Sequence, residues 1–135
     1  MIKFNELKIG DYVVGEYEGK TWPGRVTDLN STDKQICVET EVQEIWFDEE
    51  HLFPIPITDQ ALLELNFVKE TLPDGFIKYK KGPFRIVTAK ENDFSSFEIW
   101  HREDIRMNPD IHYIHQLQNA YLQMTKVHLT NEVVV

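Results

Sequence analysis

The 135-residue sequence predicts an α+β protein, with a small β-barrel over residues 1–56 and a helix–antiparallel meander–helix unit over residues 57–135. Three observations lead to this fold class. Short extended segments separated by turn residues crowd the first part, a spacing typical of a small barrel. Pro54 and Pro56 then stiffen a connector. Residues 111–125 have the apolar spacing and the length of an amphipathic helix. A chain of this length suits one domain, so the two parts are small enough to share one core.

Strands in the first part are predicted from runs of β-branched and aromatic residues between turns. Gly10-Asp11 forms a turn before the first run, and residues 30–34 form a polar turn in the middle of the barrel. Pro23-Gly24 indicates an edge position or a bulge, because proline cannot donate a hydrogen bond to a neighbouring strand. The predicted strands cover residues 12–14, 21–29, 35–40 and 44–47, and one helical turn covers residues 48–52.

In the second part, Thr58 is a good N-cap for a short helix over residues 61–65, and Asn66 can adopt the left-handed conformation that ends it. The antiparallel meander is predicted over residues 67–70, 76–80, 84–89 and 96–101. The final helix should bury one stripe against a sheet and leave the opposite face polar. The stripe consists of Ile114, Leu117, Tyr121, Leu122 and Met124, and the polar face consists of Gln116, Asn119, Gln123 and Lys126.

The order of turns and strands in the first part resembles a known type of barrel. The segments are Gly10 to Val14 (GDYVV), Trp22 to Val26 (WPGRV), Ile36 to Glu39 (ICVE), Ile45 to Phe47 (IWF) and Asp48 to Ile55 (DEEHLFPI). Together they are similar to SH3-like barrels of the Tudor, PWWP and KOW kind. The resemblance covers residues 1–55 and implies a fold rather than an activity.

The whole chain resembles a group of small bacterial and phage proteins to which no activity is assigned. The stretches that carry the resemblance are Asn5-Glu6-Leu7 with Gly10-Asp11, Pro54 to Thr58, and His115 to Asn119 with Tyr121 and Thr125. This resemblance brings no catalytic motif and no cofactor to the chain.

Negative charge is concentrated in the first part of the chain. Residues 1–56 hold five Lys/Arg against twelve Asp/Glu, or −7, whereas residues 57–135 hold nine against eleven, or −2. An acidic surface repels phosphates and keeps a protein dissolved, or it docks a basic partner. The candidate partner-binding residues are Glu39, Glu41, Glu44, Asp48, Glu49 and Glu50, with Tyr17, Trp22 and Trp46 as aromatic groups that could hold a cation. They favour a non-enzymatic protein-interaction module, accessory or regulatory, with an acidic inhibitor of a nucleic-acid-handling protein as a special case.

A basic patch supports an alternative function, nucleic-acid binding. It consists of Lys78, Lys80, Lys81, Arg85 and Lys90, interleaved with Phe76, Tyr79 and Phe84. Cations beside aromatic rings can hold the backbone and stack the bases of a nucleic acid. The same residues are also compatible with ordinary solvated strand faces, where lysine discourages strand pairing.

Catalysis has little support in the sequence. No Walker loop, nucleophile elbow or HExxH motif is present, so we expect neither catalytic residues nor a cofactor. His112 and His115, with Glu103 and Asp104 upstream, leave a metal-dependent enzyme as a third hypothesis, although no complete metal site is predicted. Cys37 is the single cysteine and cannot form an intrachain disulfide. Since no export signal or membrane-spanning run is evident, a cytoplasmic location is expected.

Overall fold

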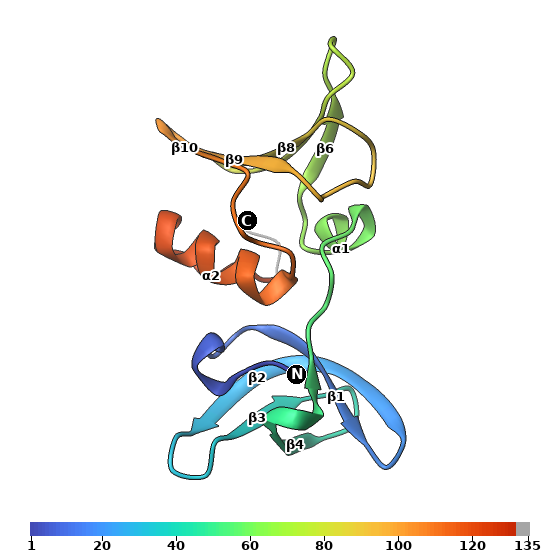
Figure 1. Ribbon diagram of the computed structural model, residues 1–135, viewed down its shortest axis with the longest axis vertical. Helices are drawn as coiled ribbons and strands as arrows, with labels where there is room; N and C mark the ends of the chain where they lie inside the picture. Colours follow the sequence, from blue (N-terminus) through green and yellow to red (C-terminus); the bar gives the residue numbers. More distant parts are fainter. Residues whose placement is uncertain (132–135) are drawn as a thin grey trace. The chain divides into compact units, whose positions relative to one another are not determined.

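The chain builds two five-stranded antiparallel sheets together with a few helices, which confirms the predicted α+β class (Figure 1). This computed structural model describes residues 1–131. Two compact units are present. Unit 1 contains residues 1–56 and 113–119, and unit 2 contains residues 57–112 and the chain after residue 119. The sequence divided the chain at a single point, whereas the structure assigns the first half of the last helix to unit 1.

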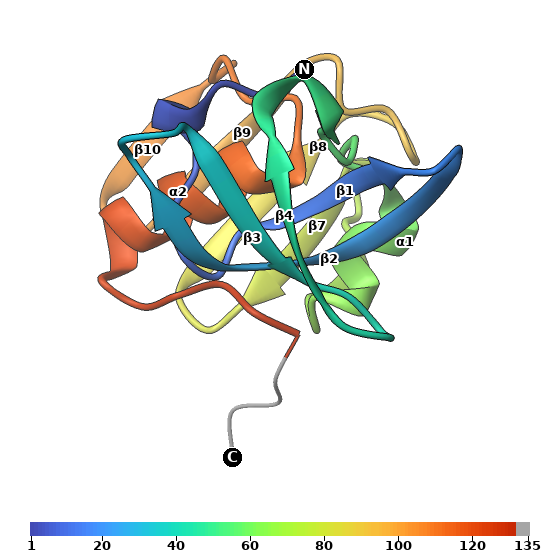
Figure 2. The ribbon, with the colours of Figure 1, turned by 90° about the horizontal axis from the view of Figure 1, so that it is seen from below.

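Unit 1 is a twisted sheet with the strand order β4-β3-β2-β1-β5 (Figure 2). Its core contains Val13, Val26, Ile36, Val38, Phe47 and Leu52, together with Ile2 and Leu7 from the N-terminal segment. Strand pairing is recorded from β4 to β5, and closure of this sheet into an SH3-like barrel stays a prediction. The elements are η1 (Phe4–Glu6), β1 (Tyr12–Tyr17), β2 (Lys20–Asn30), β3 (Gln35–Glu39), β4 (Glu44–Asp48), η2 (Glu49–His51) and β5 (Leu52–Phe53).

Strand β2 explains why Pro23-Gly24 is tolerated inside a sheet. Pro23 pairs only with Val14 of β1, because the pairing of β2 with β3 begins at Arg25. Proline therefore occupies a local edge, as the sequence predicts. Gly24 is required by space, since a Cβ there would lie 2.3 Å from the backbone oxygen of Glu39.

Unit 2 contains α1 and an antiparallel sheet with the order β10-β9-β8-β7-β6. The Thr58 hydroxyl accepts a hydrogen bond from the Ala61 amide at 3.1 Å, and Asn66 has φ +67°, so both predicted ends of the first helix are confirmed. The elements are α1 (Asp59–Glu64), β6 (Val68–Thr71), β7 (Ile77–Lys81), β8 (Phe84–Thr88), β9 (Phe97–His101) and β10 (Asp104–Met107).

Strand β10 is absent from the prediction, which placed the final helix directly after residues 96–101. A two-residue turn at Arg102-Glu103 returns the chain, so that Asp104 pairs with His101. The strand escaped detection because its apolar residues, Ile105 and Met107, are 44% and 63% exposed and give no core-facing pattern.

Helix α2 (Ile114–Thr125) begins three residues later than predicted. The predicted stripe is confirmed at Ile114, Leu117 and Tyr121, which are buried. The predicted polar face is wrong at Asn119, which is half-buried and donates a hydrogen bond to the Glu6 carbonyl at 2.8 Å. Within residues 1–131, no helix has the length and apolar character needed to cross a bilayer.

Candidate functional site

The sheet of unit 2 has one apolar face and one mixed face. Side chains alternate between the two faces along each strand. The residues that alternate with the buried ones therefore lie on the outer face of the sheet. The buried residues are Ile77, Tyr79, Phe84, Ile86, Phe97 and Ile99. Cross-strand pairing then aligns Lys80 with Arg85 and Arg85 with Trp100 on this outer face. Two lysines, an arginine and a tryptophan from three strands are thereby brought together: Lys78, Lys80, Arg85 and Trp100.

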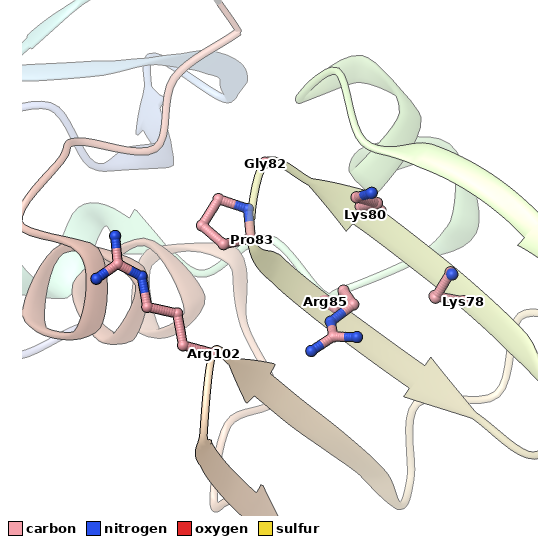
Figure 3. Close-up of a pocket in the computed structure, with 6 residues that line it drawn as sticks. All are labelled: Lys78, Lys80, Gly82, Pro83, Arg85 and Arg102. Atoms are coloured by element: carbon pink, nitrogen blue, oxygen red, sulfur yellow. The ribbon is translucent and has the colours of Figure 1, made fainter.

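Four cations line one open depression of about 390 Å³, here called the cationic depression. Its lining is Lys78, Lys80, Gly82, Pro83, Arg85 and Arg102 (Figure 3). Lys78 forms an ion pair with Glu70 at 3.0 Å. Across residues 1–131, the structure gives no ion pair to Lys80, Arg85 or Arg102. Like charges directly opposite each other destabilise a sheet, so the Lys80–Arg85 pair is an arrangement that an anion would relieve.

Two hairpin turns set the position of this depression. Gly82, with φ +58°, and Pro83 form the two-residue turn between β7 and β8. Arg102 has φ +56° in the turn between β9 and β10, a conformation that favours glycine or asparagine. The guanidinium of Arg102 is therefore presented from a backbone geometry to which arginine is poorly suited, and replacement by asparagine should be tolerated.

A second depression of about 370 Å³, the aromatic depression, lies beside the first and shares Lys78 and Arg85 with it. Its apolar walls are Leu72, Phe76, Val87 and Trp100. The Arg85 guanidinium carbon lies 5.5 Å from the centre of the Trp100 ring, a distance at which a cation is attracted to the ring face. Trp100 Nε1 donates to Glu98 at 2.9 Å, and this bond fixes the indole.

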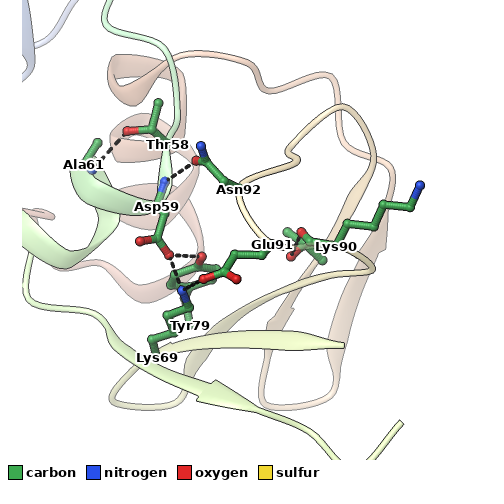
Figure 4. A network of polar contacts seen from close by, with 9 residues as sticks. Thr58, Asp59, Ala61, Lys69, Tyr79, Lys90, Glu91 and Asn92 are labelled. Atoms are coloured by element: carbon green, nitrogen blue, oxygen red, sulfur yellow. Dashed lines mark hydrogen bonds and ion pairs between the residues drawn. The ribbon is translucent and has the colours of Figure 1, made fainter. Parts of the chain in front are cut away.

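Two other members of the predicted basic patch do not line either depression. The Lys81 ammonium donates to the backbone carbonyls of Leu65 and Thr130, both at 2.9 Å. Burial lowers the pKa of Lys81, and its role is structural. Lys90 is exposed in the loop that follows β8 (Figure 4). Arg102 and Trp100, which complete the site, were missed because a sequence does not show which turns and strands become neighbours.

A polar network near α1 joins Asp59, Lys69, Tyr79 and Glu91 (Figure 4). The Tyr79 hydroxyl donates to Asp59 at 2.5 Å, and the Lys69 ammonium lies 2.9 Å from Asp59 and 2.5 Å from Glu91. The Tyr79 and Lys69 hydrogen bonds lower the pKa of Asp59, whereas Glu91 and Asp59 raise the pKa of Lys69. Burial, with Asp59, raises the pKa of Tyr79. Each group is held more firmly in its ordinary charge state, which suits a structural tie better than proton transfer near neutral pH.

The six candidate acids of unit 1 do not form one cluster. Glu39 lies directly across from Glu44, and its carboxylate is 3.7 Å from Arg25. Asp48, Glu49 and Glu50 line a separate depression of about 200 Å³ with Met1, Asp33 and Lys34. Glu49 also accepts a hydrogen bond from the Phe4 amide at 2.6 Å, so it anchors the N-terminal segment. Glu41 lies in the exposed turn between β3 and β4.

The three candidate aromatic residues do not share one face. Trp22 pairs with Gly15 and Tyr17 follows the same alternation, which places both on the core-facing side of their strands. Trp46 lies between Ile45 and the core residue Phe47, so it points to the other side and is 46% exposed. Trp22 and Trp46 therefore cannot wall a single cation cage.

Only one of the two candidate metal-ligating histidines, His115, lies in helix α2. Helix α2 begins after His112, whose Nε2 lies 3.0 Å from Asp110, while His115 is 2% exposed and lies 3.7 Å from Glu6. In the described part of the chain, no group of three His, Cys, Asp or Glu side chains could hold a metal ion. Cys37 is buried.

A cluster of buried polar side chains in unit 1, here called the polar cluster, was not predicted. It contains Asp11, His115 and Gln118. The Gln118 side chain accepts from the Tyr12 amide at 2.7 Å and donates to the Gly10 carbonyl at 2.9 Å. Asp11 is 3% exposed, and burial raises its pKa to about 7 in spite of the Lys8 amide and Asn119, which lower it. Burial also lowers the pKa of His115. The Gln118 contacts hold α2 to the N-terminal segment.

Comparison with known proteins adds no further evidence on function. No protein-family model, no curated protein and no solved structure matches this chain.

Proposed function

We propose that this chain is a non-enzymatic nucleic-acid-binding protein that uses the cationic depression to hold the phosphate backbone. The observation that carries the proposal is the convergence of Lys78, Lys80, Arg85 and Arg102 on one depression, with no ion pair recorded in residues 1–131 for three of them. Phosphate oxygens are the ligands that clustered Lys and Arg side chains bind best. The sequence favoured a protein partner, and the spatial convergence of the cations reverses that order.

The net charge of −9 shapes the expected binding. Long-range repulsion from unit 1 slows association, whereas contacts within the depression act at short range. Binding should therefore be weak at physiological salt and should strengthen steeply as salt is lowered. Each phosphate contact contributes roughly one unit to the slope of log affinity against log salt.

Fluorescence anisotropy of short labelled oligonucleotides, titrated with protein over a salt series, tests the proposal. Asparagine adopts the left-handed backbone conformation of residue 102 more readily than arginine, so the Arg102→Asn protein should fold at least as well as the wild type. The slope of log affinity against log salt should fall by about 1. Lys80→Ala should weaken binding similarly. Lys90→Ala is the matched control, because Lys90 is exposed and lies outside the depression. Absence of binding at low salt, or an equal loss in Lys90→Ala, would overturn the proposal.

A second candidate function is docking of a basic protein on the acidic strand face of unit 1. It is favoured by Glu39 and Glu44, which lie opposite each other beside the half-exposed Trp46. The partner would present a positive surface, such as the groove of a nucleic-acid-handling protein. Reversal of Glu44 and Asp48 to Lys should abolish recovery of that partner from a host lysate, while Arg25→Ala should preserve it. An unchanged set of recovered proteins after reversal would exclude this surface.

A further inference from the structure

The two depressions on the outer face of the unit 2 sheet differ in chemistry although they are adjacent. They share Lys78 and Arg85, and neighbouring positions on one face of a sheet are separated by roughly 5 to 7 Å. Four cations line the first depression. Apolar and aromatic side chains form half of the lining of the second, which also contains Asp74 and Glu98. A ligand that covers both must therefore carry a negative group next to a flat apolar one.

The two carboxylates of the aromatic depression affect which part of the ligand enters which depression. Asp74 and Glu98 offset the charges of Lys78 and Arg85 in the aromatic depression, so a phosphate is attracted more strongly to the cationic depression, which no carboxylate lines. Phe76 is 39% exposed, and Arg85 lies over Trp100 as a second flat group. Bases stack on aromatic rings and on guanidinium planes of this kind.

We propose that the ligand is single-stranded nucleic acid, with a phosphate in the cationic depression and a neighbouring unstacked base in the aromatic depression beside Phe76, Arg85 and Trp100. This inference rests on the proposed function and adds the strandedness of the ligand. In a duplex the bases are stacked and paired inside the helix, so only phosphates could reach the sheet. A single strand can turn a base outward and use both depressions.

The test compares four probes at low salt by anisotropy or by competition: a single-stranded oligonucleotide, its duplex, a strand of the same length without bases, and a nucleoside triphosphate. The single strand should bind about tenfold more tightly than the strand without bases, since stacking of one base supplies an advantage of this order. Phe76→Ser and Trp100→Leu should reduce the ratio of the two affinities to about one. Trp100→Phe should restore most of the advantage.

Phe76 lies in an exposed hairpin segment, so the Phe76→Ser protein keeps the test valid if Trp100→Leu fails to fold. Equal affinity for the duplex, the base-free strand and the single strand would overturn the inference while leaving phosphate binding intact. Tighter binding of the nucleoside triphosphate than of the strand would also overturn it, because the ligand would then be a free nucleotide. If no probe bound at low salt, the proposed function would fail together with the inference.

Discussion

The acidic run of unit 1 and the basic residues of unit 2 are organised in opposite ways. Six acids lie close together in the sequence, from Glu39 to Glu50, yet only Glu39, Glu44 and Asp48 share a strand face, whereas Glu41 lies in a turn and Glu49 and Glu50 lie in η2. Four cations spread from Lys78 to Arg102 line one depression, because β7 and β8 place three of them on one face and the turn after β9 adds the fourth. Clustering in the sequence is therefore a poor guide to clustering in space, and strand register is the better one.

The two units also differ in how they use buried polar groups. Unit 1 buries Asp11, His115 and Gln118 in the polar cluster, where Gln118 links α2 to the N-terminal segment by hydrogen bonds. Unit 2 leaves Lys80 and Arg102 exposed on the sheet. Polar groups of unit 1 should therefore affect folding, whereas those of the cationic depression should affect binding.

The largest effect is expected for Gln118→Ala. Removal of the side chain leaves the Tyr12 amide and the Gly10 carbonyl without the partner that Gln118 supplies, so the free energy of unfolding should fall by about 3 kcal/mol. Gln123→Ala, on the same helix but exposed, should change it by less than about 0.5 kcal/mol. Urea titration of both variants measures the difference. Similar urea midpoints for the two variants would show that the Gln118 hydrogen bonds do not stabilise unit 1.

Asp11→Asn should change the pH dependence of stability. The pKa of Asp11 in the folded chain is raised to about 7, so the folded state holds a proton that the unfolded state releases near its ordinary value of 3.8. Stability from this group is present below the ordinary pKa and is lost as the pH rises through about 7. At pH 8 the variant should be more stable than the wild type, and the advantage should shrink towards pH 4.

Urea titrations over that pH range measure this effect. His115 acts in the opposite direction, because its lowered pKa makes stability fall as the pH decreases below its ordinary value of 6.5. It is present in both proteins and cancels in the difference. A constant difference at every pH would contradict the raised pKa of Asp11.

Lys80 and Lys81 are neighbours on β7, but we expect one to affect binding and the other to affect stability. Lys81→Ala removes two hydrogen bonds to the Leu65 and Thr130 carbonyls and should cost about 1.5 kcal/mol of unfolding free energy. Lys80→Ala should cost less than about 0.5 kcal/mol, because Lys80 is exposed. Thermal unfolding and oligonucleotide titration of both proteins should rank them in opposite order. The same ranking in both measurements would show that the basic patch acts as one unit.

Local physics made much of the fold predictable from the sequence. The Thr58 cap, the left-handed Asn66 and the turns at Gly10 and Gly82 depend on residues within a few positions of one another. Strand β10 was missed because its apolar residues are exposed and carry no core pattern. The burial of Gln118 could not be predicted from the sequence either, because its hydrogen-bond partner Tyr12 is 106 positions away.

The candidate site was half predictable. Lys78, Lys80 and Arg85 were found because they lie in one hairpin, whose register follows from a two-residue turn. Arg102 and Trp100 belong to the next hairpin, and only the order of strands in the sheet makes them neighbours. Lys81 and Lys90 were included with the others because charge alone does not reveal which way a side chain points.

The smallest effect is expected for Glu44→Lys in unit 1. Glu44 lies directly opposite Glu39, and like charges in this position destabilise a sheet, so the substitution should raise the unfolding free energy by about 0.5 kcal/mol. Glu41→Lys makes the same change of charge in the exposed turn, away from a direct cross-strand partner, and should give less than half of that gain. Added salt should reduce the gain in both variants, because exposed charges are screened. Urea titration at low and physiological salt measures both, and an equal gain for the two variants would mean that net charge, rather than the cross-strand pair, sets the electrostatic cost of the acidic run.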